Sequence, residues 1–533
     1  MKRTVYLLIA AMVCCGALCI GQEHHHDMGE STGTVSFAVS CTPAAKEAFI
    51  RGLVLLHSFE YEESGKEFQS AAKSDPQCAM ADWGEAMSLY HQLWEQPSKE
   101  NLKRGAELLA KARALQAPTA RERDYIAALA VFYADTDKLD HGQRAKAYAT
   151  AMQGVYERNP KDTEAAVFYA LALLASSSNG DLNLTNAKAA VAILTKLFDE
   201  QPTHPGIAHY IIHSCDNPSM ANLALPAALK YAAIAPTSPH AVHMPSHIFA
   251  RLGLWQEDIR SNLAALHAAD EMAAMHFHVL HHKVHSMDFL EYAYLQIGDD
   301  ASAKAEVDKM DEMLMQDADP EFRDYFEIRR TRFPAVYAIE RRQWREALAL
   351  QPNREAAPYA QLLTYWARAI AAGHLHDAAA GQDAMKHFDE LLEATRRGPK
   401  PYIADGFKWD RDIVRAWTDH AAGKSDEGLQ LLRNVADEQD KLGKGETDLP
   451  AREMLADMLL DLKRGPEALA EYEVALRTDP NRFDGLYGAA QAAEQTKEKE
   501  KAYAFYAQLV KNCDGSHSDR PELEKAKTLL AAK

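Results

Sequence analysis

A recurring spacing of small, apolar and proline residues constrains how this chain can fold. A small residue, an apolar residue four positions later and a proline eight positions after that occur at Ser64/Phe68/Pro76, Ala190/Leu194/Pro202, Ala224/Ala228/Pro236 and Ala468/Tyr472/Pro480. The small residue lets two helices approach, the apolar side chain fills the groove between them, and the proline ends the second helix. The pattern therefore predicts an all-α solenoid built from helix pairs.

This spacing resembles that of the tetratricopeptide repeat family over nearly all of residues 41–515. The segments WGEAMSLYHQLW, HPGIAHYIIH and PHAVHMPSHIFARLGLW are similar to those of a bacterial group of exported repeat proteins with no established activity. The resemblance implies a right-handed superhelix of helix pairs. It also implies that the first helices line a concave groove that binds a protein or peptide.

The chain divides into four expected segments. Residues 1–21 combine two basic residues, an apolar run and a small-residue end, which indicates a secretory leader. Residues 22–40 lack helical periodicity and predict a flexible lead-in that contains a short histidine tract. Residues 41–395 hold the N-terminal and central repeats, and residues 396–533 hold the C-terminal repeats and a capping helix, after an aperiodic break at 396–410.

The leader predicts export to the periplasm or the exterior, with lipoprotein anchoring the weaker alternative, and no later stretch predicts a transmembrane segment. The cysteines beyond the leader are Cys41, Cys78, Cys215 and Cys513. Cys41 and Cys78 introduce successive repeats, so their helix starts should be neighbours. We therefore expect one disulfide between them.

The formal net charge of −18 disfavours nucleic acid and anionic lipid as partners. Attraction of cations is the better expectation for such a chain, although an acidic surface can also serve solubility alone.

Histidine is concentrated in the central repeats, where about half of the 23 histidines lie within residues 204–285. His209 and His213 are four residues apart, and so are His243 and His247, one 34-residue period later. A four-residue step places two side chains on one helix face, and the period brings that face to the equivalent place on the next repeat. Pro245 lies inside the second pair and predicts a kink there.

The next repeat extends this wall, because counting back from Gly298 as from Gly253 gives Asp288, with His285 one turn before it. The predicted ligands of one or two divalent transition ions are His209, His213, His243, His247, His285 and Asp288. Imidazole and carboxylate suit Zn, Cu, Fe or Ni. The side chains expected to orient these ligands are Tyr210, Asp216, Glu291 and Tyr292.

Three functions stay open from the sequence. The chain can be an exported scaffold whose concave groove binds a metal or ligand through the His/Asp cluster. It can instead be a metal-dependent oxidoreductase or hydrolase that uses the cluster, although the repeats contain no HExxH or CxxC motif. The remaining alternative is a scaffold that binds only proteins or peptides, with histidines that serve packing.

Overall fold

The computed structural model describes residues 32–93, 96–177, 181–274, 278–313 and 322–532, and these residues form helices without a strand. The expected secretory leader and the histidine tract lie outside them. In the N-terminal half the helices are α1 (Pro43–His57), α2 (Tyr61–Ser74), α3 (Ala79–Ser88), α4 (Lys99–Ala114), α5 (Ala120–Phe132), α6 (His141–Arg158), α7 (Thr163–Ala175), α8 (Thr185–Phe198), α9 (Pro205–Cys215), α10 (Ala221–Ile234), α11 (Pro239–His243), α12 (Pro245–Arg251) and α13 (Trp255–Ala274). The C-terminal half contains α14 (Leu280–Gln296), α15 (Asp300–Glu312), α16 (Arg323–Glu340), α17 (Trp344–Ala349), α18 (Pro358–His374), α19 (Ala378–Arg397), the 3-10 helix η3 (Pro401–Phe407), α20 (Lys408–Ala421), α21 (Ser425–Leu442), α22 (Ala451–Asp461), α23 (Gly465–Thr478), α24 (Phe483–Gln495), α25 (Lys499–Asn512) and α26 (Pro521–Ala531).

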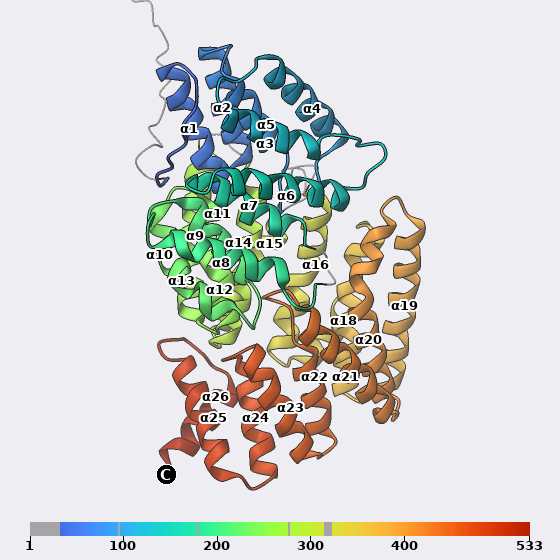
Figure 1. Ribbon diagram of the computed structural model, residues 1–533. Helices are drawn as coiled ribbons and strands as arrows, with labels where there is room; N and C mark the ends of the chain where they lie inside the picture. The colour runs from blue at the N-terminus through green and yellow to red at the C-terminus, as the bar shows by residue number, and fades with distance from the viewer. Residues whose placement is uncertain (1–31, 94–95, 178–180, 275–277, 314–321, 533) are drawn as a thin grey trace, which may run out of the picture.

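Consecutive helices pack as antiparallel pairs, and the pairs stack on one another as the sequence predicts for an α-solenoid (Figure 1). The first pair shows why the spacing has this effect. Phe68 on α2 is fully buried, and a Cβ atom added at Gly52 on α1 or at Gly84 on α3 would fall 3.0 or 2.3 Å from its ring. The buried Ser64 hydroxyl donates a hydrogen bond to the Gly52 carbonyl over 2.7 Å. The small residues therefore let one aromatic ring hold three helices together.

Residues 32–40 differ from the expected flexible lead-in, because they pack against the first repeats. Phe37 is only 2% exposed, and its ring lies 5.9 Å from that of Trp83 and 5.1 Å from that of Tyr125. The Ser40 amide and hydroxyl both donate to the carboxylate of Glu122. Phe37, the partly buried Val35 and Val39, and the hydrogen bonds of Ser40 together dock this segment.

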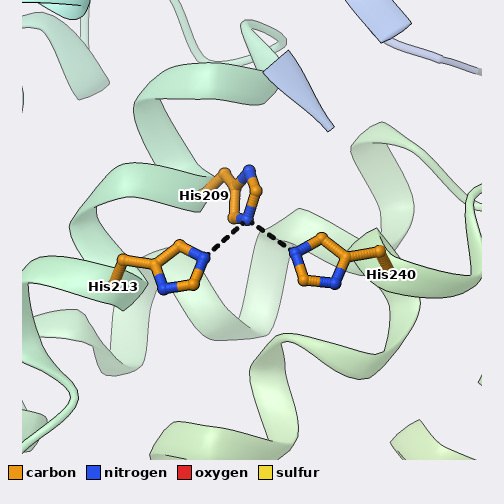
Figure 2. A group of neighbouring side chains, drawn as sticks. All are labelled: His209, His213 and His240. Atoms are coloured by element: carbon orange, nitrogen blue, oxygen red, sulfur yellow. Dashed lines mark hydrogen bonds between the residues drawn. The ribbon is translucent and has the colours of Figure 1, made fainter. Parts of the chain in front are cut away.

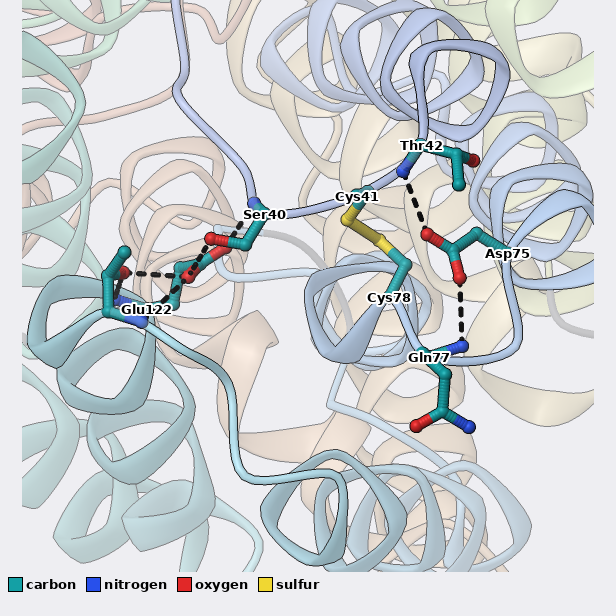
Figure 3. The surroundings of a disulfide bond; sticks show 8 residues. Ser40, Cys41, Thr42, Asp75, Gln77, Cys78 and Glu122 are labelled. Atoms are coloured by element: carbon teal, nitrogen blue, oxygen red, sulfur yellow. Dashed lines mark hydrogen bonds between the residues drawn. A yellow bond between two sulfur atoms is a disulfide. The ribbon is translucent and has the colours of Figure 1, made fainter.

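The predicted disulfide between Cys41 and Cys78 is confirmed (Figure 3). It joins the approach to α1 with the residue that caps α3. Asp75 lies beside it and accepts hydrogen bonds from the amides of Thr42 and Gln77, at 2.8 and 3.0 Å. The starts of two successive repeats are therefore fixed to each other both covalently and by hydrogen bonds.

Two large apolar clusters make up most of the core of the described residues, and smaller clusters lie between them. The first includes buried residues from Phe37 to Phe249, and the second includes buried residues from Ala335 to Ala526. Leu392 and Phe407 both belong to the second cluster, so the packing continues through the boundary expected after residue 395. In the part of the chain that the structure describes, no helix is long and apolar enough to span a membrane.

The solenoid curls until its C-terminal repeats contact its central ones, at the lower left of Figure 1. The Trp255 indole donates to the carbonyl of Asn481 over 2.8 Å, and the Asn512 amide donates to the carbonyl of Gln296 over 2.8 Å. Arg520 forms an ion pair of 2.6 Å with Asp300. These contacts bring the connection between α21 and α22 against the histidine-bearing helices.

Candidate metal centre

The first predicted histidine pair lies on α9 and gains a third histidine from α11 (Figure 2). The Nε2 atom of His209 lies 3.0 Å from Nε2 of His213 and 3.0 Å from Nε2 of His240. Figure 2 shows His213 and His240 approaching His209 from two sides. We call His209, His213 and His240 the first histidine trio.

The second predicted pair, His243 and His247, remains in contact although the helix is interrupted between them. Pro245 cannot donate a helical hydrogen bond, and the helix divides at Met244 into α11 and α12. Nε2 of His243 nevertheless lies 3.1 Å from Nε2 of His247.

His285 from α14 completes the second histidine trio. Its ring centroid lies 4.4 Å from that of His243 and 5.7 Å from that of His247. In each trio one ligand atom per histidine lies within 4.8 Å of the other two. The trios share α11, where His240 and His243 are one helical turn apart.

The outer nitrogens of two of these imidazoles, those of His209 and His243, are held by acceptors. Nδ1 of His209 donates to the carbonyl of His57 over 2.6 Å, and Nδ1 of His243 donates to the Asn262 side-chain oxygen over 2.6 Å. The Asn262 amide donates in turn to Asp258, which fixes its orientation. This arrangement turns the Nε2 lone pairs of His209 and His243 inward, as in metal sites whose ligands are oriented by an outer layer of acceptors.

The carbonyl that holds His209 belongs to a residue that is itself fixed by a buried network. Glu164 accepts from Nε2 of His57 over 2.9 Å and from Nε2 of His204 over 2.7 Å, and all three side chains are buried. The two histidines lower the pKa of Glu164 well below its usual range despite its burial. Tyr210, one of the predicted orienting residues, contacts Nδ1 of His57 over 3.0 Å and therefore supports His209 indirectly.

Burial sets the protonation of the trios. It lowers the pKa of His209 and of His243 to about 3, and it lowers the pKa of His213, His240 and His285 well below the ordinary value. These imidazoles are therefore neutral near pH 7, which is the state that binds metals.

His247 differs from the other five histidines because carboxylates face its outer nitrogen. Nδ1 lies 2.9 Å from Asp216 and 3.2 Å from Glu446. Burial alone would lower the pKa of His247, but these two carboxylates outweigh it and raise the pKa to about 10. Arg251 bridges the same carboxylates over 3.0 and 3.1 Å. Asp216 thus contacts one of the predicted ligands, and its orienting role stays a prediction.

Asp288 does not join the histidines as expected. Its carboxylate accepts from Arg332 over 2.7 Å and from the Thr447 hydroxyl over 3.1 Å, and it lies 3.3 Å from Arg329. A buried carboxylate requires compensating charge, and the arginines of α16 supply it.

Glu291 and Tyr292 also depart from their expected orienting roles. Tyr292 hydrogen-bonds Arg482, which forms ion pairs with Glu340 and Glu453. Glu291 is fully buried without a hydrogen-bond partner in the described structure, and burial raises its pKa well above the usual range. Neither side chain hydrogen-bonds a trio histidine.

Two contributors to the site are absent from the sequence prediction. His240 lies three residues before His243, so helical spacing alone could have placed it beside the pairs. Glu446 reaches His247 from the connection between α21 and α22, 199 residues away, and no local pattern indicates such a contact. Arg251 also donates to the Lys444 carbonyl, and Arg332 donates to Thr447, so this connection is fixed at several points.

A cavity of about 400 Å³ adjoins the first trio, and its lining includes Phe59 and His282. The ring of Phe59 lies 4.4 Å from that of His209, and the ring of His282 lies 6.2 Å from that of His240. A single layer of side chains therefore separates the cavity from the trio. Glu60, Glu63 and other acidic residues line its walls.

Comparison with protein-family models and with curated proteins finds no match for this chain. Among solved structures, a human IFIT1 dimer with m7Gppp-AAAA is 12% identical with a TM-score of 0.37, over 82% of this chain and 90% of that chain. The Cut9–Hcn1 hetero-tetramer of the APC/C is 13% identical with a TM-score of 0.32, over 84% and 76% of the two chains. At this level of similarity we infer nothing about ligands, and the α-solenoid assignment rests on the helix pairs of this chain.

Proposed function

We propose that this chain is a helical-repeat metalloprotein that binds two transition-metal ions, one in each histidine trio. The observation that carries the proposal is the approach of three Nε2 atoms in the first trio, with His213 and His240 each 3.0 Å from His209.

The spacing of the nitrogens supports a single ion in each trio. Two nitrogens bound at ~2.0–2.1 Å to a tetrahedral ion lie roughly 3.3 Å apart. The contacts of 3.0 and 3.1 Å are close to that value, so small rotations of the rings would admit an ion. Without an ion, His213 and His240 would both turn to the single Nε2 lone pair of His209, because its Nδ1 already donates to the carbonyl of His57. Ordinary packing does not require this arrangement.

The ligands favour particular ions. The three neutral imidazoles of the first trio suit Zn, Cu, Fe or Ni and leave at least one coordination position open. In the second trio His247 would release its proton when an ion binds, because its raised pKa keeps the imidazole protonated near pH 7. The carboxylates of Asp216 and Glu446 offset part of the positive charge at the second trio, a role the sequence assigned to Asp288.

The cavity beside the first trio favours a second candidate function, a metal-dependent enzyme that admits a small molecule past Phe59 and His282. Its volume of about 400 Å³ falls in the range of small-molecule sites. The site includes no group that identifies an oxidoreductase over a hydrolase, so the reaction type is left open.

Binding of a protein or peptide in the concave groove stays a prediction. Glu446 and Thr447 already contact the histidine-bearing wall and α16, so a peptide would need another stretch of the groove. Export to the periplasm or exterior likewise stays a proposal, based on residues 1–21.

The test is elemental analysis of tag-free protein that lacks residues 22–27, which removes the histidine tract. We expect at least two equivalents of metal in this protein and the loss of about two of them in a His209→Ala/His243→Ala variant. His267→Ala is the matched control, because its side chain is 77% exposed and lies on α13, outside both trios. Substoichiometric metal in both proteins, with melting temperatures unchanged by Zn or Cu, would contradict the proposal.

A further inference from the structure

A third group of metal-ligating side chains lies in the C-terminal repeats, on helices other than those of the trios. It comprises His376, His420 and Asp461. His376 follows α18 by two residues, His420 lies in the last turn of α20, and Asp461 is the last residue of α22. These are first helices of successive pairs, so the stacking of the solenoid brings their C-terminal ends together.

The distances suit one small cation. Nε2 of His420 lies 3.1 Å from Oδ2 of Asp461, and Nε2 of His376 lies 3.4 Å from the same oxygen. The edges of a tetrahedral or octahedral site with bonds of ~2.0–2.2 Å measure roughly 3.0–3.5 Å. The donor atoms are therefore already spaced as ligands of a single ion.

The surroundings fix His420, which is buried, and leave His376 exposed to solvent. His420 is buried, its Nδ1 lies 2.9 Å from the Ser425 hydroxyl, and its ring lies 5.7 Å from that of Trp417. The His376 side chain is 59% exposed and the Asp461 side chain is 35% exposed. An ion here would keep water or another exogenous ligand on its outer side.

The backbone adds a favourable field. The C-terminal end of a helix carries a partial negative charge, and three such ends converge on this group. In the described structure the ion pairs of Asp461 are with His376 and His420 rather than with a lysine or arginine. A divalent cation would replace two weak imidazole contacts with direct coordination.

We propose that His376, His420 and Asp461 form a surface site for one divalent first-row transition ion, bound by two imidazole nitrogens and one carboxylate oxygen. Two histidines and one carboxylate suit Zn, Fe, Co or Ni rather than Mg or Ca, which prefer oxygen ligands. This site is independent of the two trios, and it can be present whether or not they bind metal.

The test is a calorimetric titration with Zn²⁺ on the full chain lacking residues 22–27, in the His209→Ala/His243→Ala background that disables the trios. We expect one binding event in this background. His376→Ala should abolish it or weaken it at least tenfold, and because this residue is exposed the substitution should leave folding intact. Asp461→Asn, which keeps the side-chain shape, should act in the same way.

The matched control is His387→Ala. His387 is exposed and lies 3.4 Å from Asp383, so it forms a histidine–aspartate pair without a second histidine. We expect its titration to equal that of the background protein. The proposal is overturned if the background protein binds no Zn²⁺, or if His376→Ala and Asp461→Asn bind it as His387→Ala does.

Discussion

Glu60 offers a prediction that the structure allows to be worked through in numbers. This residue caps α2, is 4% exposed, and accepts a hydrogen bond from the Ser238 hydroxyl at the start of α11. Burial and the neighbouring Glu63 carboxylate raise its pKa to about 8, although the Ser238 hydrogen bond acts in the opposite direction. The folded protein therefore keeps a proton that the unfolded chain releases near pH 4.5.

The sign follows from proton linkage. Between about pH 4.5 and pH 8 the unfolded state binds fewer protons than the folded state, so stability falls as pH rises through this window. Relative to low pH, where Glu60 is protonated in both states, this linkage lowers the free energy of unfolding by about 3 kcal/mol at pH 7 and by less than about 1 kcal/mol at pH 5. Glu60→Gln keeps an acceptor for Ser238 and cannot ionise. It should therefore raise the free energy of unfolding by about 3 kcal/mol at pH 7 and change it little at pH 5.

The assay is urea unfolding followed by circular dichroism at pH 5 and pH 7, with attention to the transition of the N-terminal repeats, because a solenoid need not unfold in one step. Glu62→Gln is the control, since Glu62 is adjacent but 54% exposed. If Glu60→Gln lowers stability at pH 7 but not at pH 5, the carboxylate is ionised and stabilising in the folded protein. That result would refute the reasoning.

Three further predictions concern the metal centre and the N-terminal repeats. Glu446→Gln should weaken Zn²⁺ binding at the second trio by about 10–100-fold and leave the first trio unchanged, because it removes one carboxylate from Nδ1 of His247. Competition with a chromophoric chelator measures the two affinities. Equal affinities at both trios would count against the prediction. Cys41→Ser/Cys78→Ser should lower the free energy of unfolding by about 4 kcal/mol, because the bridge closes a loop with a sequence separation of 37; the urea midpoint checks this, and an unchanged midpoint would contradict it. Phe37→Ala should cost about 3–5 kcal/mol and expose residues 32–40 to proteolysis, whereas continued protection of this segment would show that Phe37 does not dock it.

Local spacing predicts much of this fold. The Ser64/Phe68 spacing identifies a helix pair, because contacts within a repeat involve residues close in sequence. Pro245 predicts the division between α11 and α12 for the same reason, since its effect acts within one helical turn.

Contacts between distant segments set the limit of the sequence prediction. Asp288 is on the same helix as His285, yet Arg332 on α16 takes its carboxylate. Glu446 supplies the charge at His247 because the solenoid curls back on itself, and helical periodicity contains no information about that closure. The three-residue spacing from His243 could have indicated that His240 belongs to the site, but the contact of His240 with His209 depends on the approach of α9 to α11.

The most direct test of the two-ion proposal is anomalous diffraction from crystals of the protein lacking residues 22–27, grown with Zn²⁺ or Cu²⁺ and recorded at the metal edge. We predict a peak at each trio, one about 2.0–2.1 Å from Nε2 of His209, His213 and His240, and one at the same distance from the imidazole nitrogens of His243, His247 and His285. If neither trio shows a peak and the imidazoles are still hydrogen-bonded to one another, the proposal is contradicted.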